Sequence, residues 1–362
     1  MRRLRIAVLS PLYESVPPKL YGGTERVVSY LSEALVKAGQ DVTLFASGDS
    51  NTSARLVPVT SRSLRLDPGC RDPIACHFML MERVLKHEEE FDIIHSNVDY
   101  LSLAFARRMR TPFVTTLHGR LDIPEVASIF SEYREFPLIS ISNAQRRPMP
   151  RANWLRTVYH GIPADLYAYN GRPGEYLVFV GRISPEKKID SLIRIALEAE
   201  IPLKIAAKVD KADSDYHEAV VRPLLDSSLV EFLGEVNDRE KDSLLGGALA
   251  CLHPADWPEP FGLALIEAMC CGTPVIARRR GSIPEVVDHG VTGLIFDRDE
   301  EAVFYIRNHI ASVSRAGCRR RFEERFSSTR MAEDYLAAYR SVLAAPREAD
   351  SDGPGKVIEK ML

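Results

Sequence analysis

The first half of the chain alternates between two hydrophobic patterns. Short runs rich in β-branched residues predict buried strands, and the segments between several of them carry apolar residues at helical spacing. The clearest helical stripe consists of Val27, Val28, Leu31, Leu35 and Val36. Buried strands separated by helices indicate βαβ units and a parallel sheet, with right-handed crossovers. The expected strands are Arg5–Leu9, Asp41–Ala46, Asp92–His95, Pro112–Leu117 and Leu138–Ser142.

The same alternation restarts in the second half, beginning with the apolar run Tyr176–Gly181 (YLVFVG). Helices are expected at Glu186–Ala199 and Leu263–Cys271. The further strands expected are Leu203–Ala207, Val230–Leu233, Ala248–His253, Pro274–Ala277 and Gly293–Phe296. The fold class is therefore predicted to be α/β, with two doubly wound, Rossmann-like parallel sheets.

A chain of 362 residues favours two domains. We expect the first at residues 1–165 and the second at 166–328, joined within the Pro- and Gly-containing stretch Gly161–Gly174. A final helix is expected at 329–344, and the polar tail 345–362 is expected to be disordered. Two such domains facing each other create a cleft at the carboxyl ends of the strands, where open α/β sheets bind ligands.

Composition and charge narrow the function classes. A net charge of -3 with 45% apolar residues is typical of an ordinary globular protein and disfavours a nucleic-acid partner. The first apolar run, Ile6–Leu9, is too short for a signal peptide, and no stretch approaches the roughly 20 apolar residues of a membrane span. The six cysteines form no C-x-x-C pair, which favours reduced, packed thiols. We expect a cytoplasmic protein, and peripheral contact with a membrane surface stays open.

The segment Glu259–Glu267 (EPFGLALIE) places two glutamates around a helix start. The backbone N–H groups of Phe261, Gly262 and Leu263 lack helical partners there, and with the helix dipole they favour a diphosphate. Glu267, inside the helix, could accept from both hydroxyls of a ribose, and Glu259 from a sugar beyond the phosphates. Alternatively Glu259 caps the helix and Glu267 is solvated, which the intervening Pro-Phe-Gly disfavours.

Two cations, two glycines and a histidine add to this picture. Arg182 projects from the end of a strand and Lys187 opens the next helix, so the pair can hold a diphosphate and stabilise a departing one. Gly22 and Gly23 begin the first helix, where backbone N–H groups can approach a phosphate. His118 ends a strand of the first domain and should face the cleft. Singly, each of these features is also common in structural positions.

Taken together, these motifs resemble glycosyltransferase family 4, whose members have the two-domain GT-B fold. The family hallmark E-P-F-G-x-x-x-x-E fits Glu259–Glu267, and Arg182 with Lys187 resembles its G-R-x-x-x-x-K-G. Cys271–Ile276 and Gly281–Glu285 are similar to the segments that follow in the family. The resemblance covers nearly the whole chain.

The resemblance implies a function for several residues. Glu259 would contact the donor sugar and Glu267 the ribose, while a glycine loop at Gly22 and Gly23 closes over the donor and His118 lies near the donor sugar. It further implies net retention at the anomeric carbon, an acceptor-side first domain and a final helix that crosses back to that domain.

We therefore expect metal-independent transfer of a hexose from a UDP- or GDP-sugar to a sugar, lipid-linked or small-molecule acceptor, with no cofactor. No nucleophile is evident opposite the leaving group, so same-face attack assisted by the leaving phosphate is favoured, with Glu259 orienting the sugar. The expected catalytic residues are Glu259, Arg182, Lys187 and His118. The expected donor-binding residues are Gly22, Gly23, Arg182, Lys187, Glu259, Phe261, Gly262, Leu263 and Glu267.

The chain departs from the family pattern in places. Lys188 stands where glycine is usual, and His160 stands where asparagine is usual and receives no role. Ala206–Val209 replaces a glycine-rich turn, and its Lys208 is either a third cation near the phosphates or solvated. Asp213–Asp215 spells D-x-D, but its place in a polar helix entry favours helix capping over metal binding.

Two other function classes stay open. A GT-B-fold nucleotide-sugar epimerase would need acid and base groups around the sugar, of which no full set is evident. A non-catalytic nucleotide-sugar-binding protein would bind without turnover, which the intact cations and glutamates disfavour. A dinucleotide dehydrogenase is disfavoured because no G-x-G-x-x-G follows the first strand. The loops Ser15–Lys19 and Arg120–Glu125 should shape the acceptor site without naming an acceptor.

Overall fold

The computed structural model describes residues 2–19 and 22–345, which form two α/β domains. The first contains a seven-stranded parallel sheet of order β3-β2-β1-β4-β5-β6-β7. Its strands are β1 (Arg5–Leu9), β2 (Asp41–Ser47), β3 (Arg55–Thr60), β4 (Ile93–Ser96), β5 (Phe113–Thr116), β6 (Leu138–Ser140) and β7 (Trp154–Thr157). Its helices are α1 (Gly23–Lys37), α2 (Pro73–Lys86), α3 (Leu103–Ala106) and α4 (Pro124–Glu132).

The sequence did not predict β3 and β7, the two edge strands of this sheet. Both are only partly buried along their length, so they lack the apolar signal of the central strands. β3 also contains Pro58, a residue that sheets tolerate at an edge. The central strand β1, by contrast, is almost entirely buried and was predicted with the bounds that the structure shows.

The second domain contains a six-stranded parallel sheet of order β10-β9-β8-β11-β12-β13. Its strands are β8 (Leu177–Ile183), β9 (Leu203–Val209), β10 (Val230–Gly234), β11 (Ala250–His253), β12 (Val275–Arg278) and β13 (Gly293–Phe296). Its helices are α5 (Ile189–Ala199), α6 (Ser214–Tyr216), α7 (Asp238–Gly246), α8 (Leu263–Cys270), α9 (Ile283–Val286), α10 (Asp299–Asn308) and α11 (Arg315–Arg325). The predicted fold class of two doubly wound parallel sheets is confirmed.

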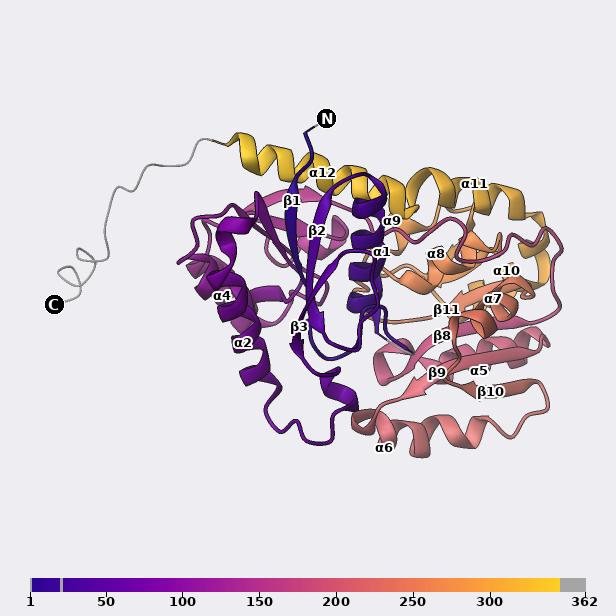
Figure 1. Ribbon diagram of the computed structural model, residues 1–362. Helices are drawn as coiled ribbons and strands as arrows, with labels where there is room; N and C mark the ends of the chain where they lie inside the picture. The colour runs from indigo at the N-terminus through magenta and orange to yellow at the C-terminus, as the bar shows by residue number, and fades with distance from the viewer. Residues whose placement is uncertain (1, 20–21, 346–362) are drawn as a thin grey trace.

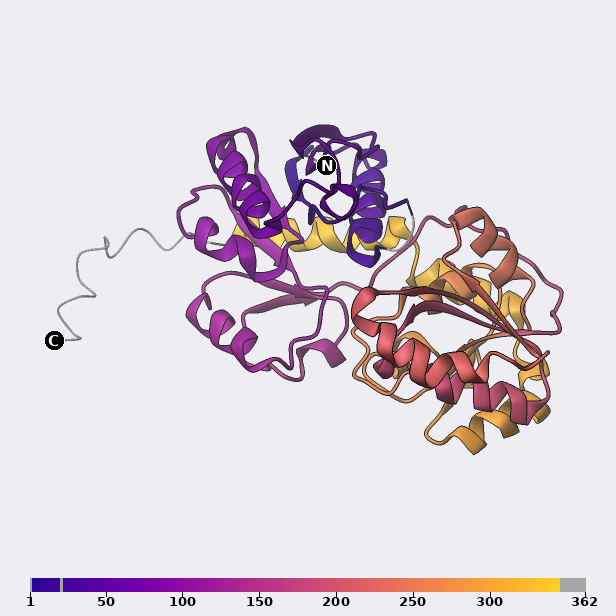
Figure 2. The same cartoon turned by 90° about the horizontal axis from the view of Figure 1, so that it is seen from below.

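Alternate residues of each sheet face different apolar cores. On β8, Leu177 and Phe179 pack with α5 and α10, whereas Val178 packs on the opposite face with α8. The cluster that contains Val178 also contains Ile6 and Leu31 of the first domain. The two domains therefore share one continuous apolar core, and Figures 1 and 2 show them as adjoining lobes.

The last helix, α12 (Ser328–Ala344), starts in the second domain and lies along the first (Figure 1). Its Tyr335 hydroxyl lies 3.0 Å from Thr116 Oγ1 on β5, and its Tyr339 hydroxyl lies 2.8 Å from Nδ1 of the buried His95. The predicted boundary at 165/166 falls in the connection between β7 and β8. Except for Ala345, the tail expected to be disordered lies outside the described residues.

A carboxylate of the second domain also binds the first. Glu285 on α9 accepts hydrogen bonds from the backbone N–H groups of Asn143 and Ala144 at 2.8 and 2.7 Å. It accepts two more from the Asn143 amide and the Tyr159 hydroxyl, both at 3.0 Å. The end of β6 is thereby fixed against α9, which sets the spacing of the domains beside the cleft.

The connection between the two domains crosses closely over the start of α12 at Gly161. The Ile162 N–H donates to Phe326 O at 2.9 Å, and the Ser328 N–H donates to Ile162 O at 2.8 Å. A Cβ on Gly161 would lie 2.3 Å from the Ser327 carbonyl oxygen. We expect Gly161→Ala to lower the free energy of unfolding by about 1–3 kcal/mol through overpacking, measured by denaturant titration.

Gly246→Ala is the matched control, because its added Cβ meets its nearest atom at an ordinary 3.7 Å. It should leave the stability unchanged or raise it. Equal stabilities of the two variants would contradict the crossing described here.

Candidate functional site

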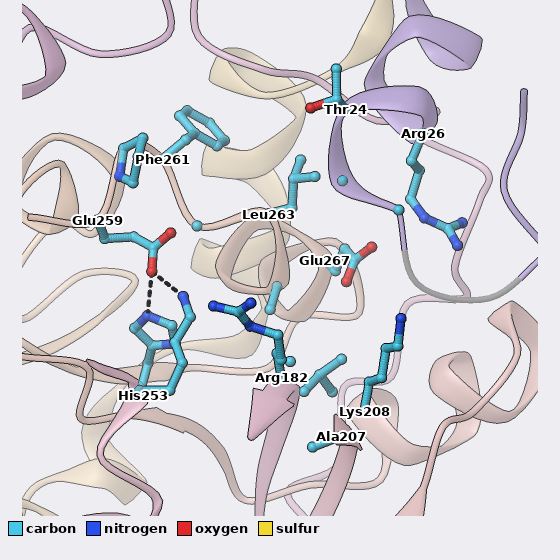
Figure 3. A pocket seen from close by; sticks show the side chains of 18 of the residues that line it. Thr24, Arg26, Arg182, Ala207, Lys208, His253, Glu259, Phe261, Leu263 and Glu267 are labelled. Atoms are coloured by element: carbon cyan, nitrogen blue, oxygen red, sulfur yellow. Dashed lines mark hydrogen bonds and ion pairs between the residues drawn. The ribbon is translucent and has the colours of Figure 1, made fainter. Parts of the chain in front are cut away.

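A cavity of about 460 Å³ lies between the two domains, at the carboxyl ends of both sheets. Figure 3 shows side chains of both domains pointing into it. The residues that the sequence analysis selected all line this cavity, namely Gly22, Gly23, His118, Arg182, Lys187, Glu259, Phe261, Gly262, Leu263 and Glu267. Residues of both domains, from Gly22 to Glu267, thus meet in this cavity.

Two helix N-termini face each other across the cavity. α1 begins after Gly22 and α8 after Gly262, and neither cap makes a side-chain cap hydrogen bond. A Cβ placed on Gly23 would lie 3.9 Å from Leu263 Cδ1, so the two first turns are in close proximity. Gly262 has φ +88°, a left-handed conformation that favours glycine. The opposed N–H groups and dipoles make this end of the cavity suitable for an anion.

Glu259 is buried at the wall of the cavity, with its Oε2 atom surrounded by donors. Lys187 Nζ forms an ion pair with that atom, and Trp257 Nε1 donates to it at 3.0 Å. His253 Nε2 lies 3.4 Å away (Figure 3). Burial alone would raise the pKa of Glu259, but Lys187 and His253 lower it to about 2. The carboxylate therefore remains charged at neutral pH and can accept hydrogen bonds from a ligand.

The segment after β12 holds the Glu259 loop in place. Gly281 has φ +51°, and a Cβ there would lie 2.3 Å from the Glu259 carbonyl oxygen. The Ser282 N–H donates to Glu259 O, and Ser282 Oγ donates to Phe261 O, both at 2.9 Å. The Gly-Ser pair therefore positions both ends of Glu259–Phe261 relative to the first turn of α8.

Arg182 lies among carboxylates at the end of β8. Its NH2 group donates to Glu186 at 2.6 Å, and NH1 lies 3.7 Å from both Asp210 and Asp213. The expected helix-capping role of Asp213 was wrong, because that residue makes no side-chain cap hydrogen bond. Its carboxylate instead faces the guanidinium of Arg182.

The segment after Arg182 also differs from the expected helix. Lys187 ends a 3-10 turn, Pro185–Lys187, and the helix α5 begins only at Ile189. Lys188 between them has φ +54°, in the left-handed region. This conformation gives a physical reason for the glycine that the family has at this position. The turn points Lys187 toward Glu259.

Glu267 lies beside a charge network that joins the two domains. Its Oε1 accepts from Lys241 Nζ at 2.8 Å, and Lys241 also lies 3.3 Å from Asp238. Arg26 on α1 donates to both carboxylate oxygens of Asp238, at 2.7 and 2.9 Å. Burial disfavours the Asp238 carboxylate, but Arg26 and Lys241 lower its pKa below its usual value. Figure 3 shows Arg26 and Glu267 on opposite sides of the same opening.

His118 is a neutral imidazole in the cavity wall. Its Nε2 lies 2.9 Å from Asn97 Oδ1, and the Asn97 amide is oriented by donating to Leu9 O at 3.1 Å. Nε2 is thus the donor, and the buried Nδ1 has no partner among the described residues. Burial lowers the pKa of His118 to about 3.

Several cavity residues were missed or left without a role in the sequence analysis. His253 ends β11 and could have been found by the strand-end argument used for His118. Lys241 and Arg26 carry no local signal, because their partners Glu267 and Asp238 lie far away in the sequence. Trp257 lies only two residues before its partner Glu259 and was overlooked. Lys208 does line the cavity, and its Nζ lies 2.8 Å from Asp210.

Two further properties of residues 2–19 and 22–345 bear on the function of the site. No group of three or more His, Cys, Asp or Glu side chains in this part of the chain is arranged as a metal site. No helix there is both long and apolar enough to cross a bilayer. The six cysteines, all in the described part, are free thiols.

Both halves of the chain match known protein families. Residues 21–166 match the family model Glycosyltransferase Family 4, and residues 171–315 match Glycosyl transferases group 1. Over 336 residues the chain is 29% identical to a D-inositol 3-phosphate glycosyltransferase of Frankia alni. That alignment covers 76% of this chain and 82% of the relative.

Solved structures share the two-domain arrangement. Sucrose-phosphate synthase from Thermosynechococcus elongatus superposes with a TM-score of 0.77 at 22% identity, covering 95% of this chain and all of that one. Anabaena HepE, solved with UDP-glucose, superposes with a TM-score of 0.71 at 20% identity, covering 94% of this chain and all of that one. At these identities the likeness shows the fold, which is the GT-B architecture.

The buried neutral histidines predict how stability depends on pH. In the unfolded chain His118 has a pKa near 6.5, and in the folded chain its pKa is about 3. Below pH 6.5 the unfolded chain therefore binds a proton that the folded chain does not, and stability falls as the pH is lowered. From pH 7 to pH 5 this group should cost about 2 kcal/mol of the free energy of unfolding.

Denaturant titrations of the wild type and of His118→Asn at pH 7 and pH 5 measure this contribution. The wild type should lose about 2 kcal/mol more than the variant over that interval, because only the wild type has the titrating ring. Equal losses of the free energy of unfolding in the two proteins would show that folding does not lower the pKa of His118, contrary to this prediction.

Proposed function

This chain belongs to glycosyltransferase family 4, and on that premise we propose that it transfers a hexose from a UDP- or GDP-sugar to an acceptor, with retention and without a metal ion. The observation that supports this most directly is the cavity between two facing helix N-termini, whose wall carries the buried, ionised Glu259. A diphosphate ester of a sugar matches both features. Its anionic phosphates suit the helix N-termini, and its sugar hydroxyls can donate hydrogen bonds to the Glu259 carboxylate.

Each part of the proposed donor has its own place in the cavity. Its diphosphate occupies the space between the first turns of α1 and α8, near Arg182 and Lys187. Its ribose hydroxyls donate to the carboxylate of Glu267, and its sugar lies beside Glu259 and His118. Anabaena HepE, which has the same fold, was solved with UDP-glucose, and this supports a nucleotide sugar as the ligand class.

Binding requires the cations of the cavity to change partners. Arg182 pairs with Glu186, and Lys187 pairs with Glu259. The diphosphate adds negative charge beside both pairs and competes with Glu186 for the guanidinium, which can bind a phosphate through two parallel N–H groups. The helix amides need no such exchange, since no side chain caps them.

The proposed catalysis rests on stabilising the charges that develop on the sugar and on the leaving diphosphate. As the glycosidic bond to the diphosphate breaks, the sugar gains oxocarbenium character and the leaving group gains negative charge. Arg182, Lys187 and the N-terminal amides of α8 stabilise that charge, and Glu259 orients the sugar through its hydroxyls. The acceptor attacks from the face of the leaving phosphate, which accepts the acceptor's proton and gives retention.

The first domain supplies the acceptor side. Arg120, in a loop expected to shape that site, places its guanidinium 6.0 Å from the ring centroid of Trp257 across the cavity. The acceptor class that we propose is a sugar, a lipid-linked or a small molecule bearing a hydroxyl. The relative in Frankia alni is named for a phosphorylated inositol, which is one such polyol.

Ligand-induced stabilisation is the first test of this proposal. We expect the melting temperature to rise with UDP, GDP or their hexose conjugates, because a ligand at 100 times its dissociation constant adds about 2.7 kcal/mol to the free energy of unfolding. One nucleotide series should stabilise the protein more than the other. A protein that none of them stabilises at millimolar concentration would contradict the proposal.

Turnover tests the roles of Arg182 and Glu259. With the donor found in this way, Arg182→Ala and Glu259→Gln should each lower the rate of nucleoside-diphosphate release by about 10²–10³, since each loses a charge at the reacting centre. Arg279→Ala is the control, because Arg279 pairs with Asp297 outside the cavity. Near-normal rates in both site variants, with folding intact, would refute the assigned roles.

Incubation of the donor without acceptor separates transfer from epimerisation. The proposed transferase should leave the sugar configuration of the intact donor unchanged, as judged by NMR. Accumulation of an epimeric nucleotide sugar would replace the transferase assignment with an epimerase that uses the same cavity.

A further inference from the structure

Trp257 is a half-buried aromatic side chain in the wall of the cavity, in the segment between β11 and α8. Phe261, His160 and His253 also line the cavity, but only 2–4% of each residue is exposed. The indole is larger than any of these rings and, unlike them, is open to a ligand.

Two hydrogen bonds fix the orientation of this indole. Trp257 Nε1 donates to Glu259 Oε2 at 3.0 Å, and the Glu259 N–H donates to Trp257 O at 2.7 Å. Pro258 lies between the two residues and restricts the backbone there. Because its nitrogen edge is bound to Glu259, the ring stands at a set angle beside the carboxylate that orients the donor sugar in the proposed complex.

The face of the indole lies where the two domains meet. Arg120, on the first-domain loop that continues from His118, holds its guanidinium 6.0 Å from the centroid of the ring. Groups packed directly on each other lie about 3.5–4.0 Å apart, so the guanidinium does not cover the indole closely. Arg120 is half exposed and bonds to Asp122 of its own loop, so a small displacement opens a slot for a flat ring.

The groups around the indole indicate the chemistry of a ligand in this slot. Lys187 Nζ lies 5.0 Å from the ring centroid, and Glu259 and Arg120 lie on either side. A pyranose ring packs its C–H face on the negative face of an aromatic ring, while its hydroxyls bond to polar neighbours. An alkyl chain would desolvate the same charges without giving them hydrogen bonds, which is costly. The slot therefore suits a sugar ring better than a lipid chain.

The position of the slot assigns this sugar to the acceptor. In the proposed complex the donor sugar lies beside Glu259 and His118, with its diphosphate at the starts of α1 and α8. Trp257 lies next to Glu259 but faces Arg120, on the loop expected to shape the acceptor site. A second ring stacked there lies next to the donor sugar, as transfer to one of its hydroxyls requires.

We propose that Trp257 is the platform for the acceptor, and that the acceptor is a sugar ring, free or part of a larger molecule, whose C–H face stacks on the indole. This proposal rests on the proposed function and narrows its acceptor class. The reaction is unchanged: the acceptor oxygen bonds to the anomeric carbon as the bond to the diphosphate breaks, and the acceptor's proton passes to the leaving phosphate. Trp257 thus orients Glu259 through Nε1 and binds the acceptor through its face.

Two substitutions of this residue separate the ring face from the hydrogen bond. Trp257→Phe and Trp257→Leu both lose the donor to Glu259, and only Trp257→Phe keeps an aromatic face. The donor is the hexose conjugate of the nucleotide that stabilises the wild type. The acceptor probes are the methyl glycosides of glucose, galactose and mannose, with glycerol as a polyol that has no ring. Steady-state rates of transfer give KM for donor and acceptor in each variant.

The KM for the best methyl glycoside should be about 3- to 12-fold higher in Trp257→Leu than in Trp257→Phe, as expected for the loss of one aromatic contact. The KM for the donor and the KM for glycerol should agree within about twofold between the two variants, because neither compound stacks on the indole in the proposed complex.

Fluorescence gives an independent readout, because the chain contains two tryptophans. Trp154 lies on β7 and does not line the cavity, and its Nε1 donates to Met149 O at 2.8 Å. In Trp154→Phe the tryptophan emission comes from Trp257, and it should shift to shorter wavelength when the glycoside joins the complex with the nucleoside diphosphate. In Trp257→Phe, which keeps Trp154, the same addition should leave the emission unchanged.

Three results would overturn this proposal while leaving the proposed function intact. Equal KM values for the glycoside in Trp257→Phe and Trp257→Leu, or an unchanged emission of Trp257, would confine this residue to holding Glu259. A wild type that hydrolyses the donor but transfers to no glycoside would exclude a simple sugar ring as the acceptor. A wild type that neither binds nor turns over a nucleotide sugar would instead overturn the proposed function, and this inference with it.

Discussion

The buried ion pair between Glu259 and Lys187 sets the geometry of the second domain's half of the site. Removing one partner from such a pair costs about 3–5 kcal/mol, so the segments that carry the two charges must meet. One segment follows β8 and the other connects β11 to α8. The contact is possible because Gly281 lets the chain after β12 pass against the Glu259 backbone. The same contact directs the carboxylate into the cavity beside the first turn of α8.

The first domain's half depends on how the two domains are joined. α12 fixes the backbone at His160, Glu285 binds the end of β6, and Arg26 pairs with Asp238. Together these contacts bring the start of α1 opposite the start of α8. The cavity consequently has a charged end between helix N-termini and an end lined by His118 and His160, which suits a ligand that is anionic in one part and rich in hydroxyls in another.

Sequence reasoning located the parts of the site whose chemistry is local. Glu259–Glu267 was identifiable because a glutamate, a glycine and a helix start follow one another along the chain. Buried central strands such as β1 were predicted well, whereas the half-buried edge strands β3 and β7 were missed. Contacts such as Lys241 with Glu267, or Arg26 with Asp238, arise only on folding. The Asp213 carboxylate shows the same limit, because it lies in a turn after β9 and its partner Arg182 lies on β8.

In the proposed complex, the diphosphate of a nucleotide sugar lies between the first turns of α1 and α8. A crystal structure with the best-binding nucleoside diphosphate would show whether the phosphates occupy that place. We expect both phosphates to lie within hydrogen-bond distance of those backbone N–H groups and of Arg182 or Lys187, and the ribose hydroxyls to contact Glu267. Phosphates bound away from both helix starts, or a ribose that does not contact Glu267, would contradict it.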